Sequence, residues 1–114
     1  VAGFSFGAWI GMQLLMRRPE ITGFVSVSPP ANMYDFSFLA PCPSSGLIIN
    51  GSADRVAPPS ETTALVNKLK EQKGITITHE EVEGSGHFFE EPHMETMIGS
   101  VTGYVKRRLT ETTR

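Results

Sequence analysis

The hydrophobic positions of the chain fall into short apolar runs separated by longer stretches with helical spacing. Residues 24–28, 46–50 and 75–82 are short runs of apolar and β-branched residues, which are typical of strands, and residues 1–2 read as the end of another. Residues 46–50 form a continuous apolar run, as in strands of a parallel sheet that are covered on both faces. The pattern therefore predicts a sheet with a buried strand.

Helical patterns mark three further segments, at residues 6–18, from about 58 to 72, and at 93–109. The first has almost no polar face, so we expect it to be buried on more than one side. The second begins at a pair of prolines, and Ser60 is placed to cap its free amides. The third has amphipathic spacing, with apolar residues at Met94, Met97, Ile98, Val101, Tyr104, Val105 and Leu109.

The alternation of strands and helices along the chain predicts the fold class. We expect an α/β fold, a three-layer αβα arrangement with a mostly parallel sheet and right-handed crossovers. In such sheets the groups that carry chemistry gather at the C-terminal ends of the strands. Residues 1–2 form only a strand end without a lead-in, so we expect residues 1–114 to be the C-terminal portion of a single domain whose N-terminal strands lie outside the chain.

Composition and charge restrict the classes of partner that the protein is expected to have. The net charge is -2 and the longest basic run is residues 106–108, so we expect no nucleic-acid partner. The longest apolar stretch, near residues 10–16, is broken by Gly11 and Gln13 and is too short for a membrane span. Cys42 is the single cysteine, which fits a reducing compartment. We therefore expect a soluble cytoplasmic protein without a membrane partner, and its oligomeric state stays open.

A serine between two glycines follows the first strand end. Gly3, Ser5 and Gly7 form a G-x-S-x-G pattern, which arises by chance in many loops but stands here between a strand and a helix. A serine hydroxyl is a poor nucleophile at neutral pH and must be presented in the open beside a base. A sharp, strained turn between strand and helix exposes the serine hydroxyl, and glycines two residues before and after it avoid the collisions that larger side chains would cause. The helix that starts at Phe6 directs its dipole and the Phe6 amide at the site, where they can stabilise an oxyanion.

Among the three histidines, His87 is the best candidate for the base. It lies in a glycine-rich loop after a predicted strand and precedes two phenylalanines that can hold the imidazole in place. His79 falls inside that strand and His93 at a helix start, so both are better explained as structural or solvated residues. A loop histidine that merely packs is the simpler alternative for His87.

Asp54 is the preferred acid, because it follows the strand at 46–50 and can accept the imidazole N–H and fix its tautomer. Asp35 is its competitor, but Asp35 lies within the loop at residues 31–45, farther from a strand end. A turn or helix-capping role remains the structural alternative for Asp54.

The segments around these residues resemble the nucleophile, acid and histidine segments of the α/β-hydrolase superfamily, at residues 3–7, 48–54 and 84–89. More closely, the chain is similar to small bacterial serine hydrolases related to dienelactone hydrolase, although dienelactone hydrolases proper carry cysteine where this chain has Ser5. The resemblance spans essentially the whole chain. It implies the C-terminal part of an α/β-hydrolase fold with a Ser-His-Asp triad, and it places a second oxyanion amide in a loop outside this chain.

Together these features predict a serine hydrolase that cleaves ester-like bonds, in carboxylic esters or thioesters, through an acyl-enzyme. We expect no cofactor and no metal. The loop at residues 31–45 is rich in large apolar side chains, so it packs over the core or lines a pocket. If it lines a pocket, the substrate is a small molecule with an apolar acyl or alcohol group.

Two alternatives stay open. A hydrolase-fold protein could bind a partner without turnover through the apolar loop residues Tyr34, Phe36, Phe38 and Leu39. A metal site could be built from His87, Glu90, Glu91 and His93, although their spacing is irregular on any helix or strand.

Overall fold

The structure, a computed structural model, describes residues 1–39 and 41–112. Within this part, four strands form one parallel sheet in the order β1 (Ala2–Phe4), β2 (Phe24–Val27), β3 (Gly46–Gly51) and β4 (Ile77–Val82). The strand order follows the sequence, so each crossover moves one step across the sheet. The predicted parallel sheet is confirmed.

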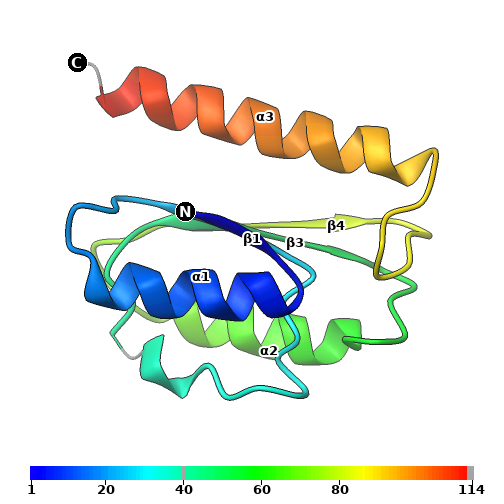
Figure 1. Ribbon diagram of the computed structural model, residues 1–114, viewed down its shortest axis with the longest axis horizontal. Coiled ribbons are helices and arrows are strands. Elements are labelled where there is room, and N and C mark those ends of the chain that lie inside the picture. Colours follow the sequence, from blue (N-terminus) through cyan, green and yellow to red (C-terminus); the bar gives the residue numbers. More distant parts are fainter. Residues whose placement is uncertain (40, 113–114) are drawn as a thin grey trace.

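Helices cover both faces of this sheet (Figure 1). The helices α1 (Phe6–Arg17) and α2 (Pro59–Lys70) lie on one face, and α3 (His93–Thr112) lies on the other. A short 3-10 helix, η1 (Ser37–Leu39), lies in the connection between β2 and β3. The three-layer αβα arrangement predicted from the alternating elements is therefore confirmed. No helix in residues 1–39 and 41–112 has both the length and the apolar character needed to cross a bilayer.

Two apolar clusters hold the layers together, one on each face of the sheet. Ile48 belongs to the cluster under α1 and α2, whereas Leu47 and Ile49 belong to the cluster under α3. All three side chains are fully buried, because alternate residues of a strand point to opposite faces. The prediction that residues 46–50 are covered on both faces is confirmed.

The Ser60 cap predicted for one helix is wrong, and the burial expected for another is found on one of its faces only within the described residues. Helix α1 is buried on one face only, and Ile10, Leu14 and Met16 are exposed, because β1 is the edge strand of the described sheet and no described element lies beyond it. Ser60 does not cap α2. The cap position is Pro58 and the helix starts at Pro59, whose missing N–H leaves one fewer donor to satisfy.

A polar pair, His79 and Asn50, lies on the α2 face of the sheet. The His79 Nε2 atom lies 2.6 Å from the Asn50 Oδ1 atom, and the Asn50 amide also donates to Glu81 at 3.1 Å. Burial lowers the pKa of His79 below its usual value of 6.5, and this outweighs the opposing charge of Glu81, while Lys70 adds to the lowering.

Because the folded pKa of His79 is depressed, its contribution to stability is complete above pH 6.5 and is lost as pH falls toward the folded pKa. We therefore expect the free energy of unfolding to fall on acidification from pH 7.5 to 5, and to fall less in His79→Gln, which has no titrating ring. Urea unfolding across this range measures both slopes. Identical slopes in the two proteins would contradict the depressed pKa.

Candidate active site

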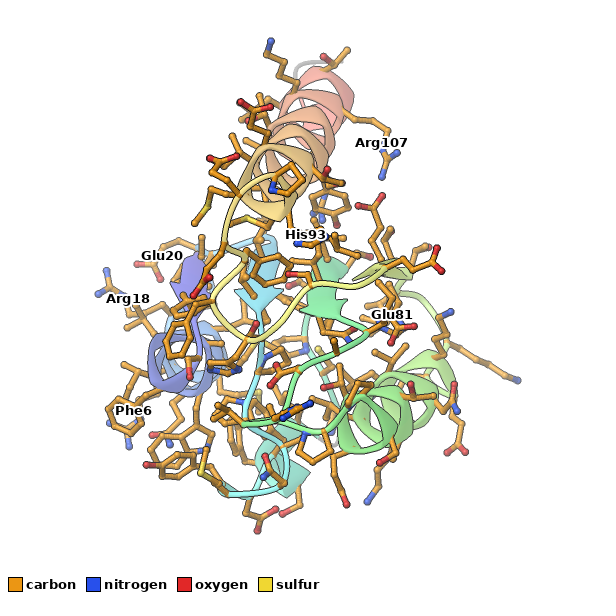
Figure 2. The ribbon with its side chains drawn as sticks, turned by 90° about the vertical axis from the view of Figure 1, so that its right-hand side faces the viewer. Phe6, Arg18, Glu20, Glu81, His93 and Arg107 are labelled. Carbon is orange, nitrogen blue, oxygen red and sulfur yellow. The ribbon has the colours of Figure 1, made fainter. Side chains whose placement is uncertain are left out.

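The three residues singled out by the sequence lie at the C-terminal ends of the strands. Ser5 follows β1, Asp54 lies in the loop after β3, and His87 lies in the loop after β4. Parallel strands end at one edge of their sheet, so loops distant in sequence meet there. Figure 2 looks onto this edge, with the start of α1 at the lower left and the loop after β4 crossing in front of the strands.

Ser5 has a strained backbone that turns its side chain out between strand and helix. Its φ of 54° and ψ of -118° lie outside the helix and strand regions, and such a conformation costs about 1–3 kcal/mol. The Ser5 N–H donates to the Val27 carbonyl at 2.8 Å, and the Ser5 carbonyl accepts from the Ala8 N–H at 2.9 Å. The sheet and the helix therefore hold the turn from both sides.

The two glycines of the motif have different surroundings. A Cβ atom at Gly3 would lie 2.2 Å from the carbonyl oxygen of Gly7. Leaving aside its chain neighbours and the nearby backbone of its own helix, a Cβ atom at Gly7 would have no described atom within 4 Å. The close approach thus falls on Gly3 alone. The steric role expected for Gly7 is not found among the described residues, because Gly7 lies in the first turn of α1 with open space beside it.

This difference predicts unequal effects of two alanine substitutions. Gly3→Ala must displace the turn, and a displacement of about 1 Å at a reacting group costs about 100-fold in rate. Gly7→Ala is the matched control and should keep the rate within about threefold, because no atom of another described segment stands where its methyl group goes. Initial rates with p-nitrophenyl acetate, alongside circular dichroism to check folding, measure both. Equal rates in the two variants would contradict the steric argument.

The side chains of Ser5, His87 and Asp54 form one hydrogen-bonded row. The Ser5 Oγ atom lies 2.8 Å from the His87 Nε2 atom, and the His87 Nδ1 atom lies 2.8 Å from the Asp54 Oδ2 atom. A carboxylate can only accept, so Nδ1 carries the proton and Nε2 is the acceptor for the serine hydroxyl. His87 and Asp54 are 5% and 4% exposed, which shields the pair from water, whereas Ser5 is partly exposed.

Backbone amides fix the carboxylate of Asp54. Its Oδ1 atom accepts hydrogen bonds from the N–H groups of Val56 and Ala57, both at 2.8 Å, while its Oδ2 atom faces His87. Both oxygens therefore have partners, and the carboxylate cannot turn away from the imidazole without losing bonds. The turn role considered for Asp54 and the role of imidazole partner are combined in one side chain, whereas the helix-capping role is not found, because the cap position of α2 is Pro58.

Two residues that the sequence did not single out hold the histidine loop. Ser28, which has a φ of 51°, donates from its Oγ to the His87 carbonyl at 2.9 Å. A Cβ at Gly51 would lie 2.1 Å from the Ser85 carbonyl oxygen, which accepts the Ala53 N–H at 2.9 Å, so the acid loop and the histidine loop touch. A glycine at a strand exit was a usable signal for Gly51, but nothing in the sequence distinguished Ser28 from other serines.

Comparisons with known proteins find relatives among α/β hydrolases. No family model matches the sequence. One solved structure is of an Agrobacterium tumefaciens protein of unknown function that is described as a candidate α/β hydrolase. Its sequence is 62% identical and the TM-score is 0.94, and the match covers 97% of this chain and 50% of the Agrobacterium protein. The chain belongs to the α/β-hydrolase superfamily.

Two further relatives of this α/β-hydrolase chain are less similar to it. An α/β serine hydrolase homologue from Coxiella burnetii is 30% identical with a TM-score of 0.69, over 83% of this chain and 43% of its own. The uncharacterized protein RP471 of Rickettsia prowazekii is 50% identical over 93 residues, which cover 78% of this chain and 39% of RP471. The chain thus spans half the length, or less, of these three proteins.

The competing residues of the α/β-hydrolase chain lie elsewhere or serve other purposes. Asp35 accepts the Ser37 N–H at 2.8 Å in the exposed loop, and this hydrogen bond lowers the pKa of its carboxyl group. His79 pairs with Asn50 on the sheet, and His93 starts α3. Within the described residues, no group of three or more His, Cys, Asp or Glu side chains is placed to hold a metal ion. The structure therefore gives no support to the alternative metal site.

The apolar loop between β2 and β3 both packs over the core and contributes to the surface beside the site. Phe36 and Leu39 are buried in the cluster under α1 and α2. Tyr34 is exposed and stacks on Trp9 with ring centroids 4.9 Å apart. Two cavities of the described part, about 430 and 410 Å³, do not have Ser5 in their lining. Ser5 therefore lies beside an aromatic surface rather than in either cavity.

Proposed function

We propose that the protein is a serine hydrolase that cleaves ester-like bonds, in carboxylic esters or thioesters. The observation that carries this proposal is the row from Ser5 Oγ to His87 Nε2 and from His87 Nδ1 to Asp54 Oδ2, with 2.8 Å at each step, on a strained turn after β1. The similarity to α/β serine hydrolases supports it. One of them, a protein from Xanthomonas campestris that is 29% identical with a TM-score of 0.75, is described as an α/β serine hydrolase without a lid.

The first half-reaction forms an acyl-enzyme. The Ser5 oxygen attacks the carbonyl carbon while His87 Nε2 takes its proton, and the carbonyl oxygen becomes an oxyanion. Phe6 is the first residue of α1, so its N–H has no partner within the helix and can donate to that oxyanion. His87 then gives the proton to the departing alcohol or thiol, and the acyl group stays on Ser5.

The second half-reaction releases the acid and restores the serine. Water attacks the acyl carbon as His87 Nε2 takes its proton, and the C–O bond to Ser5 breaks as the proton returns to the serine oxygen. Asp54 remains ionised and stabilises the imidazolium in both halves. The atoms and protons of both halves balance with the ester, water and these three side chains alone.

The experiment that separates this proposal from partner binding without turnover is an ester and thioester screen. Because the resemblance places a second oxyanion amide outside residues 1–114, the full-length polypeptide is the one to assay, with p-nitrophenyl acetate, p-nitrophenyl butyrate and a short acyl thioester. We expect steady turnover that His87→Ala removes and that the matched control His93→Ala keeps. Turnover that survives His87→Ala, or no turnover of any substrate, would overturn the proposal.

A further inference from the structure

Large aromatic side chains stand on both sides of Ser5. Its two neighbours in sequence, Phe4 and Phe6, are 40% and 50% exposed. Single exposed apolar groups are ordinary on a protein surface, but a contiguous set beside a reactive group marks a binding surface. Each of these two phenylalanines begins such a set.

The first set, the histidine-side wall, consists of Phe4 and Phe88. Their ring centroids are 5.9 Å apart, and the rings lie 5.5 Å and 5.0 Å from the imidazole of His87. Phe88 is 61% exposed although it is a large apolar residue. This wall therefore borders the imidazole, and no other described residue covers the exposed part of its rings.

The second set, the helix-side wall, consists of Phe6, Trp9 and Tyr34. Phe6 lies 5.7 Å from Trp9 and 5.3 Å from Tyr34 between ring centroids, and Trp9 stacks on Tyr34. The Trp9 indole N–H donates to the Asp35 carbonyl at 3.0 Å, which ties α1 to the loop after β2. Figure 2 shows Phe6 projecting from the start of α1 away from the sheet. The helix-side wall thus adjoins Ser5 through its sequence neighbour Phe6, whereas the ring contacts found for His87 in the described residues are with Phe4 and Phe88.

The chemistry of the proposed reaction assigns a different part of the substrate to each wall. The leaving oxygen must take its proton from His87 Nε2, so the alcohol portion lies beside the imidazole. The oxyanion faces the Phe6 amide, and the acyl portion is the remaining substituent of the carbonyl carbon, so the aromatic set that does not border the imidazole is the one left for it. Flat apolar groups stack favourably on exposed aromatic rings.

We infer that the histidine-side wall binds the alcohol portion and the helix-side wall binds the acyl portion, and that the substrates are esters with flat, aromatic groups. This inference rests on the proposed function. It names Phe88 and Tyr34 as the residues that set the preference for each portion, because both are exposed and neither belongs to the hydrogen-bonded row.

Three esters separate the two walls. Ethyl acetate has small groups on both sides, benzyl acetate has a ring on the alcohol side, and ethyl phenylacetate has a ring on the acyl side. Each variant is compared with the unsubstituted protein on the same ester, so differences in intrinsic reactivity cancel. The measured quantity is kcat/KM, and the control Ile98→Ala removes an exposed apolar side chain on α3 that belongs to neither wall.

Phe88→Ala should lower kcat/KM for benzyl acetate about tenfold relative to ethyl acetate and leave the ethyl phenylacetate ratio unchanged. Tyr34→Ala should lower kcat/KM for ethyl phenylacetate about tenfold relative to ethyl acetate and leave the benzyl acetate ratio unchanged. Tyr34→Phe keeps the ring, so its ratios should equal those of the unsubstituted protein. Phe88→Leu and Tyr34→Leu keep apolar volume without a ring and give the same test if an alanine variant fails to fold.

The outcomes are distinguishable. If the unsubstituted protein hydrolyses all three esters but neither variant changes a ratio, the walls are not binding surfaces and only this inference fails. If each variant changes the ratio assigned to the other, the orientation is reversed and the inference is overturned. If no ester is hydrolysed at all, the proposed function fails first and the inference falls with it.

Discussion

Replacing Ser5 with alanine is expected to lower kcat for ester hydrolysis by about a million-fold, because the loss of a serine nucleophile costs this order of magnitude in triad enzymes. A methyl group in place of the hydroxymethyl group cannot form the acyl-enzyme, and His87 Nε2 would lose its partner at 2.8 Å. The fold should persist, since Ser5 makes its stabilising contacts through backbone atoms.

Steady-state rates with p-nitrophenyl acetate measure this loss, and Ser60→Ala on the exposed start of α2 is the matched control. The control should keep full activity. A Ser5→Ala protein that retains more than a few per cent of kcat, with an unchanged circular dichroism spectrum, would remove Ser5 from the reaction.

Replacing Asp54 with asparagine should lower kcat by about 10,000-fold, the effect of reversing the histidine tautomer in a triad. The amides of Val56 and Ala57 require an oxygen at the Oδ1 position, so the new NH₂ group must face His87 Nδ1. Nδ1 then becomes the acceptor and Nε2 carries the proton. The imidazole can no longer accept the proton of Ser5.

The matched control is Asp35→Asn, because Asp35 is the other acid that the sequence offers and it lies in an exposed loop. We expect its activity to stay close to that of the unsubstituted protein. The reverse result, with Asp35→Asn inactive and Asp54→Asn active, would transfer the role of the acid to Asp35. An equal loss of activity in Asp54→Asn and Asp35→Asn would contradict the assignment of Asp54 as the one acid that orients His87.

The topology could be predicted because the strands are marked by short apolar runs and the order of elements restricts a parallel sheet to few arrangements. The position of Ser5, Asp54 and His87 at one edge followed from the same rule, since each comes just after a predicted strand. What hydrophobic patterning could not show is which neighbours cover a given face. Ile10 and Leu14 are apolar, yet they lie on the exposed side of α1.

The finer geometry of the site depends on three-dimensional contacts that a linear pattern does not encode. Gly3 and Gly7 are equivalent in the motif, but only Gly3 approaches another backbone segment. Ser28 supports the His87 loop through a single hydroxyl, across 59 positions of sequence. The loop at residues 31–45 looked uniform, but its buried members pack on the core and Tyr34 lies at the surface near Ser5.

The central claim is that the Ser5 hydroxyl is activated by His87. The most direct test is to treat the protein with a fluorophosphonate and map the adduct by peptide mass spectrometry, in the unsubstituted protein and in His87→Ala. We expect a single phosphonylated peptide containing Ser5, formed much more slowly in His87→Ala. An adduct on another residue, or labelling of Ser5 at the same rate without His87, would contradict it.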